Sequence, residues 1–222
     1  MRSFAKRVFV GLLPGILAGG LFVSYGVYLW LRERYERGGP MSFRQARQLL
    51  VPARQWLHPV HETLEKFRLK PRDTVLELGP GPGYFTVEAA RMVGDQGRVL
   101  CLDIQPEMIE MLHGRLRQHG VNNAQPIVGD ATRLPLADNS VDNAFLAFVL
   151  GEVPDRPRAV AELLRVLKPG GVLSTMETLT DPDYMFEGHT RDLMAATGFR
   201  RLEHSRHRLG YIMSFGAPAS EG

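Results

Sequence analysis

The amino-acid sequence predicts an α/β protein with a mostly parallel sheet, helices on both faces, an antiparallel C-terminal hairpin and a preceding membrane-anchoring helix. After Pro71, short apolar runs alternate regularly with amphipathic helical patterns, which is typical of a parallel sheet covered on two faces. Two strand-like runs separated by Gly210 come near the end of the chain. A long uncharged apolar stretch lies near its beginning.

The length and composition fit one α/β domain with an appendage. A chain of 222 residues is short for two domains with separate cores, and its 44% hydrophobic and 23% charged residues exclude general disorder. Its 27 basic residues are nearly balanced by 24 acidic ones, which indicates a mildly basic surface and no nucleic-acid partner. We expect three segments: a membrane anchor and hinge over 1–40, an amphipathic helical lid or membrane-surface segment over 41–70, and a catalytic domain over 71–222.

The apolar stretch runs from Val8 to Leu31 without a charged residue. As a helix rising about 1.5 Å per residue it spans a hydrocarbon core of roughly 30 Å. A buried core helix and a cleaved signal peptide are the alternatives, although the stretch is long for the latter. The excess of arginine after it predicts that the catalytic domain faces the cytoplasm. One helix face carries the glycines through which the segment would self-associate: Gly11, Gly15 and Gly19.

The elements after Pro71 follow from the apolar pattern. Helices are expected before the first strand, after the glycine-rich loop, from Pro106, from near Asp155 and up to Thr197. The apolar runs predict strands over 74–78, 98–102, 124–128, 141–149, 172–176, 201–209 and 211–215.

The most informative segment is VLELGPGPGYFT, from Val75 to Thr86. A strand delivers Glu77 to a loop that contains Gly79, Gly81 and Gly83, and glycine lets a ligand approach the backbone. The third glycine comes two residues after the second, whereas the dinucleotide fingerprint requires three. Asp103 ends the next strand, where its carboxylate can bind both hydroxyls of a ribose.

Four motifs in order make the chain from about 71 to 217 resemble the class I S-adenosylmethionine-dependent methyltransferases: ELGPGPG, LDIQPEMI, GDATRLPLADNSVDNAF and RVLKPGG. The resemblance implies a seven-strand Rossmann-like fold with S-adenosyl-L-methionine as cofactor. It assigns the three loop glycines to the methionine part and ribose, and we add Glu77, the acid that precedes them. By the same resemblance, Asp103 would hold the ribose, and Ile104, Asp130 and the backbone of Ala131 would contact the adenine. Phe148 and Val149 would lie near the transferred methyl. Asp130 as a helix cap or turn residue is the alternative.

The position after the fourth strand departs from many relatives that modify small molecules, because it holds Gly151 in place of a histidine or an aromatic residue. The candidate general bases are Glu152, His61 and Glu177. The structural alternatives are a cap before a helix for Glu152, an exposed helix residue for His61 and a strand-end ion pair for Glu177. The sequence shows no cysteine or acid spaced to form a metal site with His61.

The sequence predicts methyl transfer to a small apolar or amphiphilic acceptor at a membrane, such as a lipid headgroup, a quinone or phenol, or a thiol. An apolar anchor would keep the catalytic domain close to molecules dissolved in the bilayer. Two other functions remain open. A non-catalytic membrane-bound cofactor-binding module would keep the same glycines and acids, and a nicotinamide-dependent oxidoreductase is opposed by the glycine spacing.

Overall fold

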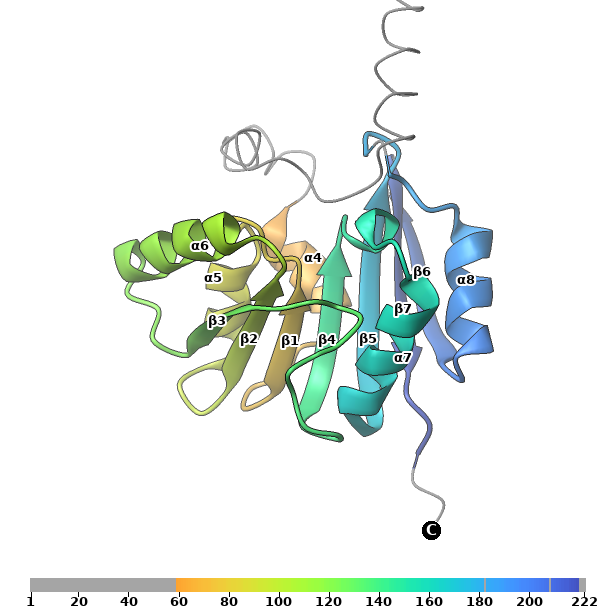
Figure 1. Ribbon diagram of the computed structural model, residues 1–222, viewed down its shortest axis with the longest axis horizontal. Coiled ribbons are helices and arrows are strands. Elements are labelled where there is room, and N and C mark those ends of the chain that lie inside the picture. The colour runs from red at the N-terminus through yellow and green to blue at the C-terminus, as the bar shows by residue number, and fades with distance from the viewer. Residues whose placement is uncertain (1–58, 182, 208, 220–222) are drawn as a thin grey trace, which may run out of the picture. The chain divides into compact units, whose positions relative to one another are not determined.

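The computed structural model describes residues 59–219 except 182 and 208 (Figure 1). Its helices are α4 (Val60–Lys66), α5 (Thr86–Val93), α6 (Pro106–Gln118), the 3-10 helix η2 (Leu150–Glu152), α7 (Arg156–Val166) and α8 (Glu187–Ala196). Its strands are β1 (Thr74–Leu78), β2 (Arg98–Asp103), β3 (Ala124–Val128), β4 (Val141–Ala147), β5 (Leu167–Thr178), β6 (Arg200–His207) and β7 (Gly210–Gly216).

The seven strands form one sheet in the order β3-β2-β1-β4-β5-β7-β6. The first five in the sequence run parallel, and β7 runs antiparallel to both of its neighbours. This topology confirms the predicted parallel sheet with an antiparallel C-terminal hairpin. The chain crosses from β3 at one edge of the sheet to β4, which lies on the other side of β1. The loops that follow the neighbouring strands β1 and β4 therefore lead in opposite directions.

Only β1 and β3 have their predicted bounds, and the differences in β5 and β4 bear on the site. β5 begins at Leu167, which pairs with Val141 of β4. The Lys-Pro-Gly-Gly stretch that follows is an irregularity within the strand, and regular pairing resumes where Val172 pairs with Asn143. β4 ends at Ala147 and not at residue 149. Phe148 has a left-handed backbone with φ of 64°, which a pleated strand does not allow, and its N–H donates to the carbonyl of Met176 at 2.9 Å.

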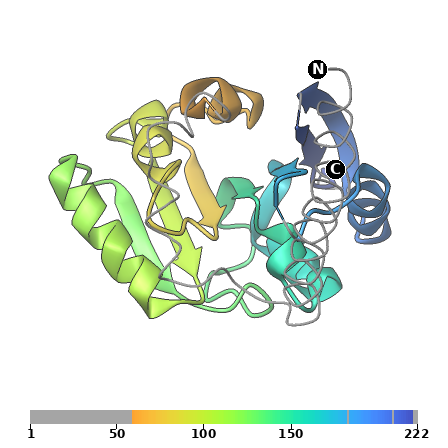
Figure 2. The ribbon, with the colours of Figure 1, turned by 90° about the horizontal axis from the view of Figure 1, so that it is seen from above.

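Separate apolar clusters cover the two faces of the sheet. Helices α4, α5 and α6 pack against one face and α7 and α8 against the other. Figures 1 and 2 show α4 and α5 behind the sheet and α7 in front of it. The buried stripes agree with the predicted helical periodicity: Ala89 and Val93 on α5, Met108, Ile109, Leu112 and Leu116 on α6, and Val160 and Leu163 on α7.

Buried polar side chains of the sheet hold the C-terminal end of α4. The side-chain amide of Asn143 on β4 donates to the carbonyl of Phe67 at 3.0 Å, and Ser174 on β5 donates to the same carbonyl at 3.4 Å. Ser214 on β7 donates to the carbonyl of Lys66 at 3.3 Å. The last carbonyls of a helix have no partner within the helix, so these bonds fix α4 over the sheet.

No helix of the described part, 59–219 with its two gaps, has the length and apolar character needed to span a bilayer. The predicted membrane anchor over 1–40, its self-association glycines and most of the predicted lid over 41–70 lie outside the described residues.

We expect Asn143→Ala to lower the free energy of unfolding by about 1–3 kcal/mol, because the buried carbonyl of Phe67 loses its shorter hydrogen bond. Denaturant titration of both proteins measures the change, with Asn122→Ala, at an exposed position before β3, as the control. Equal unfolding free energies for Asn143→Ala and the control would contradict this role.

Candidate functional site

The candidate site lies at the carboxyl edge of the parallel strands, where the loops after β1, β2, β3 and β4 meet (Figure 1). The first loop contains three glycines with left-handed backbones, with φ of 69° at Gly79, 52° at Gly81 and 85° at Gly83. A Cβ on Gly79 would clash with the methyl groups of Val149, and one on Gly83 would lie 2.6 Å from Leu112 Cδ1. Two of the glycines are therefore required by packing within the protein, a reason that the sequence pattern alone did not reveal.

Asp103 joins the glycine loop to the end of β2. Its carboxylate accepts hydrogen bonds from the N–H of Gln105 at 2.9 Å and from the N–H of Gly81 at 3.2 Å. Burial raises the pKa of this carboxyl group, and the N–H donors, which include that of Ile104, oppose the rise. Charge-assisted bonds of this kind fix the position of a carboxylate at the site.

An apolar surface lies beside this carboxylate. Ile104 follows Asp103 and is 54% exposed, while Val128 pairs with Asp103 across the sheet and is 52% exposed. Large exposed apolar side chains at the mouth of a loop cluster are typical of a ligand surface. Ile104 was predicted, whereas Val128 was missed although it is the last residue of a strand at the same edge.

Glu77 lies beneath the glycine loop and not on its surface. It is 2% exposed, and its Oε2 accepts a hydrogen bond of 2.6 Å from the hydroxyl of Thr86 at the start of α5. Burial raises the pKa of this carboxyl group to about 8, although the bond from Thr86 opposes the rise. Glu77 thus ties α5 to β1 from inside the protein.

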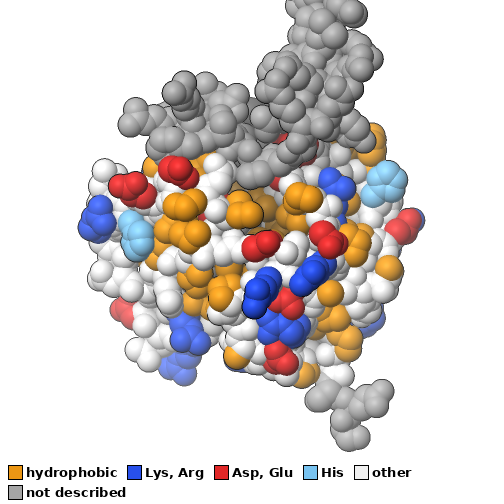
Figure 3. All heavy atoms as spheres, viewed as in Figure 1, with side chains coloured by type: hydrophobic (Ala, Val, Ile, Leu, Met, Phe, Trp, Pro, Cys, Tyr) orange, Lys and Arg blue, Asp and Glu red, His pale blue; other side chains and the backbone are white. Residues whose placement is uncertain are grey.

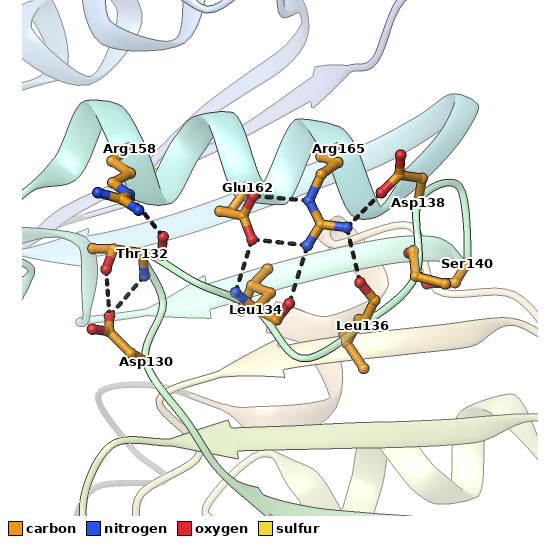
Figure 4. Close-up of polar contacts among 10 residues, drawn as sticks. Asp130, Thr132, Leu134, Leu136, Asp138, Ser140, Arg158, Glu162 and Arg165 are labelled. Carbon is orange, nitrogen blue, oxygen red and sulfur yellow. Dashed lines mark hydrogen bonds and ion pairs between the residues drawn. The ribbon is translucent and has the colours of Figure 1, made fainter.

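Asp130 forms a turn after β3. Its Oδ1 accepts bonds from the N–H of Thr132 at 2.8 Å and from the hydroxyl of the same residue at 2.9 Å (Figure 4). This oxygen has the turn-forming role that the sequence left open for Asp130. Among the described residues no hydrogen bond reaches the second oxygen, and the exposed position of Asp130 next to Ala131 leaves it accessible to a ligand.

Two of the three candidate bases come together at the ends of β4 and β5. Glu152 is half-buried on η2, and Glu177 is 1% exposed near the end of β5. The pKa of Glu177 is raised to about 8, mainly by burial and also by the carboxylates of Asp181 and Glu152, while the N–H of Met185 and the charge of Arg156 oppose the rise. No described residue makes a hydrogen bond to Oε1 of Glu177.

His61, the third candidate base, lies with different partners. It is exposed on α4, and its Nδ1 lies 2.9 Å from Oε1 of Glu88 on α5. That hydrogen bond is the main cause that raises the pKa of His61. His61 lines an open pocket of about 470 Å³ between α4, α5 and α6, together with Tyr84 and Arg115. The pocket contains neither Glu152 nor Glu177.

The structure explains why glycine follows the fourth strand. A Cβ on Gly151 would overlap the backbone carbonyl of Asp183, which packs directly on it. The loop between β5 and α8 therefore covers the position where many relatives carry a larger side chain. The exposed apolar side chains of this loop, Leu179 at 61% and Phe186 at 64%, flank this covering segment.

The comparisons with known proteins agree with this geometry. The methyltransferase domain family matches residues 75–171. Ubiquinone/menaquinone biosynthesis C-methyltransferase UbiE of Teredinibacter turnerae is 40% identical over 116 residues, which are 52% of this chain and 47% of that protein. UbiE of an Enterobacter species is 42% identical over 105 residues, 47% of this chain and 42% of that protein. The chain thus spans about half the length of the curated relatives it matches.

Solved structures share the fold. A S-adenosylmethionine-dependent methyltransferase from Aquifex aeolicus superposes with a TM-score of 0.77 at 24% identity, covering 80% of this chain and all of that one. The [4+2]-cyclase SpnF superposes with a TM-score of 0.65 at 19% identity, covering 73% of this chain and 80% of that one. The cyclase shows that the fold alone does not specify a reaction. Residues 75–171 thus match a methyltransferase domain, and the described residues have the fold of S-adenosylmethionine-dependent methyltransferases.

Proposed function

We propose that this protein transfers a methyl group from S-adenosyl-L-methionine to a ring carbon of a quinone-type acceptor. The observation that carries the proposal is the Asp103 carboxylate, fixed by backbone N–H groups at the sheet edge, in a domain about 40% identical to quinone C-methyltransferases. The match covers about half the length of those relatives, so the acceptor is inferred from their names and from the apolar surfaces of this chain.

The residues at the sheet edge fit the cofactor. Asp103 would accept hydrogen bonds from the ribose hydroxyls, as a strand-end carboxylate does in related α/β folds. Ile104 and Val128 offer exposed apolar surface to the adenine ring, and the second oxygen of Asp130 can accept from the adenine amine. The methionine part would lie against the backbone of the loop at Gly81.

The acceptor would bind at the tip of β4. When bound, S-adenosylmethionine supplies an electrophilic methyl group on its sulfonium. Phe148 and Val149 line this end with apolar side chains, and the exposed Leu179 and Phe186 suit an apolar acceptor tail. The main task of the protein is to align the acceptor carbon and to exclude water.

A carbon acceptor must lose its ring proton after the new carbon–carbon bond forms. Glu152 is the first candidate to accept that proton, because it is half-buried at the tip of β4. Glu177 stands behind it, and with a pKa of about 8 it is mostly protonated at neutral pH. In that state it can donate a hydrogen bond to an acceptor oxygen or pass a proton onward, and cannot serve as the first base.

The N-terminal segment extends the proposal to the membrane. The apolar stretch from Val8 to Leu31 would hold the domain at the cytoplasmic face of a bilayer, where prenylated quinones dissolve. Tethering raises the effective concentration of the domain toward such acceptors without any added contact. This part rests on the sequence alone.

Asp103→Ala is expected to weaken binding of S-adenosylmethionine and of S-adenosylhomocysteine by about 1.5–3 kcal/mol, through loss of charge-assisted hydrogen bonds. Titration calorimetry measures both affinities, and a thermal melt verifies that the variant is folded. Asp95→Ala, an exposed acid in the turn before β2, is the matched control. A folded Asp103→Ala variant that binds as tightly as the control would remove the ribose assignment.

The acceptor is tested with a prenylated benzoquinol or naphthoquinol that has a free ring carbon, offered in lipid vesicles with labelled methyl donor. We expect methyl incorporation on carbon, and a lower rate for a chain that starts at Met41, because that chain has lost the apolar stretch. In detergent solution the two forms should have similar rates. Preference for a water-soluble polar acceptor, equal in both forms, would overturn the proposed substrate class.

The protonation state of Glu177 predicts how stability varies with pH. Its pKa is raised from 4.5 to about 8 on folding, so the unfolded chain loses this proton first as pH rises, and stability falls between about pH 4.5 and 8. In Glu177→Gln, the decrease in the free energy of unfolding over this pH range should be smaller than in the wild type by an amount on the order of 3 kcal/mol. Denaturant titrations at pH 5 and pH 8 measure it, with Glu62→Gln, exposed on α4, as the control. If Glu177→Gln and wild type lose the same stability, Glu177 is ionised in the folded protein.

A further inference from the structure

Three arginines of α7 donate hydrogen bonds to backbone carbonyls outside the helix. Arg156 reaches η2, while Arg158 and Arg165 reach the loop between β3 and β4. Charged side chains gather over α7 and the neighbouring loop on the face shown in Figure 3. A guanidinium presents several N–H donors in a fixed plane, so one side chain can satisfy more than one carbonyl.

Arg156 holds the tip of β4. Its Nε donates to the carbonyl of Leu150 at 3.1 Å and one terminal nitrogen donates to the carbonyl of Gly151 at 2.5 Å. Both residues are buried, so their carbonyls would be costly to leave without partners. The tip that is held in this way contains Phe148, whose left-handed backbone requires support from the surrounding structure.

Arg158 holds the Asp130 turn. Its Nε donates to the carbonyl of Thr132 at 3.1 Å, and the N–H and hydroxyl of Thr132 both bind Oδ1 of Asp130 (Figure 4). The contact therefore runs from α7 through one residue to the carboxylate at the adenine side. The N–H of Arg158 itself donates to the side chain of Asp155, which caps α7.

The far half of the same loop is fixed independently. Arg165 donates to the carbonyls of Leu134 and Leu136 at 3.0 and 2.9 Å and pairs with Asp138 and Glu162, and Glu162 accepts from the N–H of Leu134 at 2.8 Å (Figure 4). The carboxylates of Glu162 and Asp138 raise the pKa of Arg165, and the bonds from Arg165 and from the N–H of Leu134 lower that of Glu162. Because this cluster anchors the loop, loss of Arg158 should loosen only the part next to Asp130.

We propose that Arg156 and Arg158, on the first turn of α7, are positioning residues for separate halves of the site: Arg156 for the β4 tip at the acceptor, Arg158 for the Asp130 turn at the adenine. The inference rests on the proposed function for the identity of the two halves. In this proposal, α7 fixes the position of the cofactor side of the site relative to the acceptor side.

The test separates binding from turnover. Arg158→Gln should raise the Kd of S-adenosylhomocysteine about three- to tenfold and leave kcat at saturating methyl donor within twofold. Arg156→Gln should lower kcat at least tenfold and leave that Kd within twofold. Arg158→Lys should restore the affinity, because a single donor is enough for one carbonyl, whereas Arg156→Lys should not restore kcat, because an ammonium cannot match a fork that bridges two carbonyls.

Arg191→Gln is the matched control, since Arg191 is exposed on α8 and pairs with its neighbour Asp192. Hydrogen exchange supplies a readout without any acceptor: the Thr132 amide should exchange faster only in Arg158→Gln, and the Phe148 and Glu152 amides only in Arg156→Gln. The proposal would be overturned if each variant changed both the Kd of S-adenosylhomocysteine and kcat, or if amide exchange became faster throughout the domain. Failure of the wild type to bind S-adenosylhomocysteine would instead refute the proposed function.

Discussion

The position of β1 in the sheet is the constraint on which the site depends. β1 pairs with β2 on one side and with β4 on the other, and the chain reaches β4 only after it has passed out to the edge at β3. The loops after β1 and β4 therefore lead away to opposite faces and leave backbone groups accessible between them. On the β2 side of this opening, the hydrogen bond from the N–H of Gly81 to the Asp103 carboxylate connects the loop after β1 to the end of β2.

Polar contacts between different helices, strands and loops hold the segments around this opening. Asn143 and Ser174 fix the end of α4, Thr86 binds Glu77 beneath the glycine loop, and Arg156 and Arg158 hold the two loops on the other face. Most of these contacts satisfy backbone carbonyls that no helix or strand supplies with a donor. A rigid site of irregular loops is thus built from side chains of regular elements.

The sequence predicted the sheet well, because apolar runs and glycine turns are local signals. It placed β1 and β3 at their observed bounds and Asp103 at the end of β2. It did not predict the early start of β5 or the left-handed Phe148, since both depend on partners in other strands. Nor did it predict the contacts of the α7 arginines, because an arginine on an amphipathic helix has the same pattern whether it faces solvent or a carbonyl.

For the candidate bases, sequence reasoning identified residue types but not their surroundings. Glu152 and Glu177 come together at the ends of β4 and β5, whereas His61 pairs with Glu88 on α5. The most direct test of the whole account is a crystal structure with S-adenosylhomocysteine. The account predicts the ribose hydroxyls on the Asp103 carboxylate, the adenine ring against Ile104 and Val128, and the sulfur facing the tip of β4 at Phe148. A ligand bound elsewhere, or with its ribose away from Asp103, would contradict it.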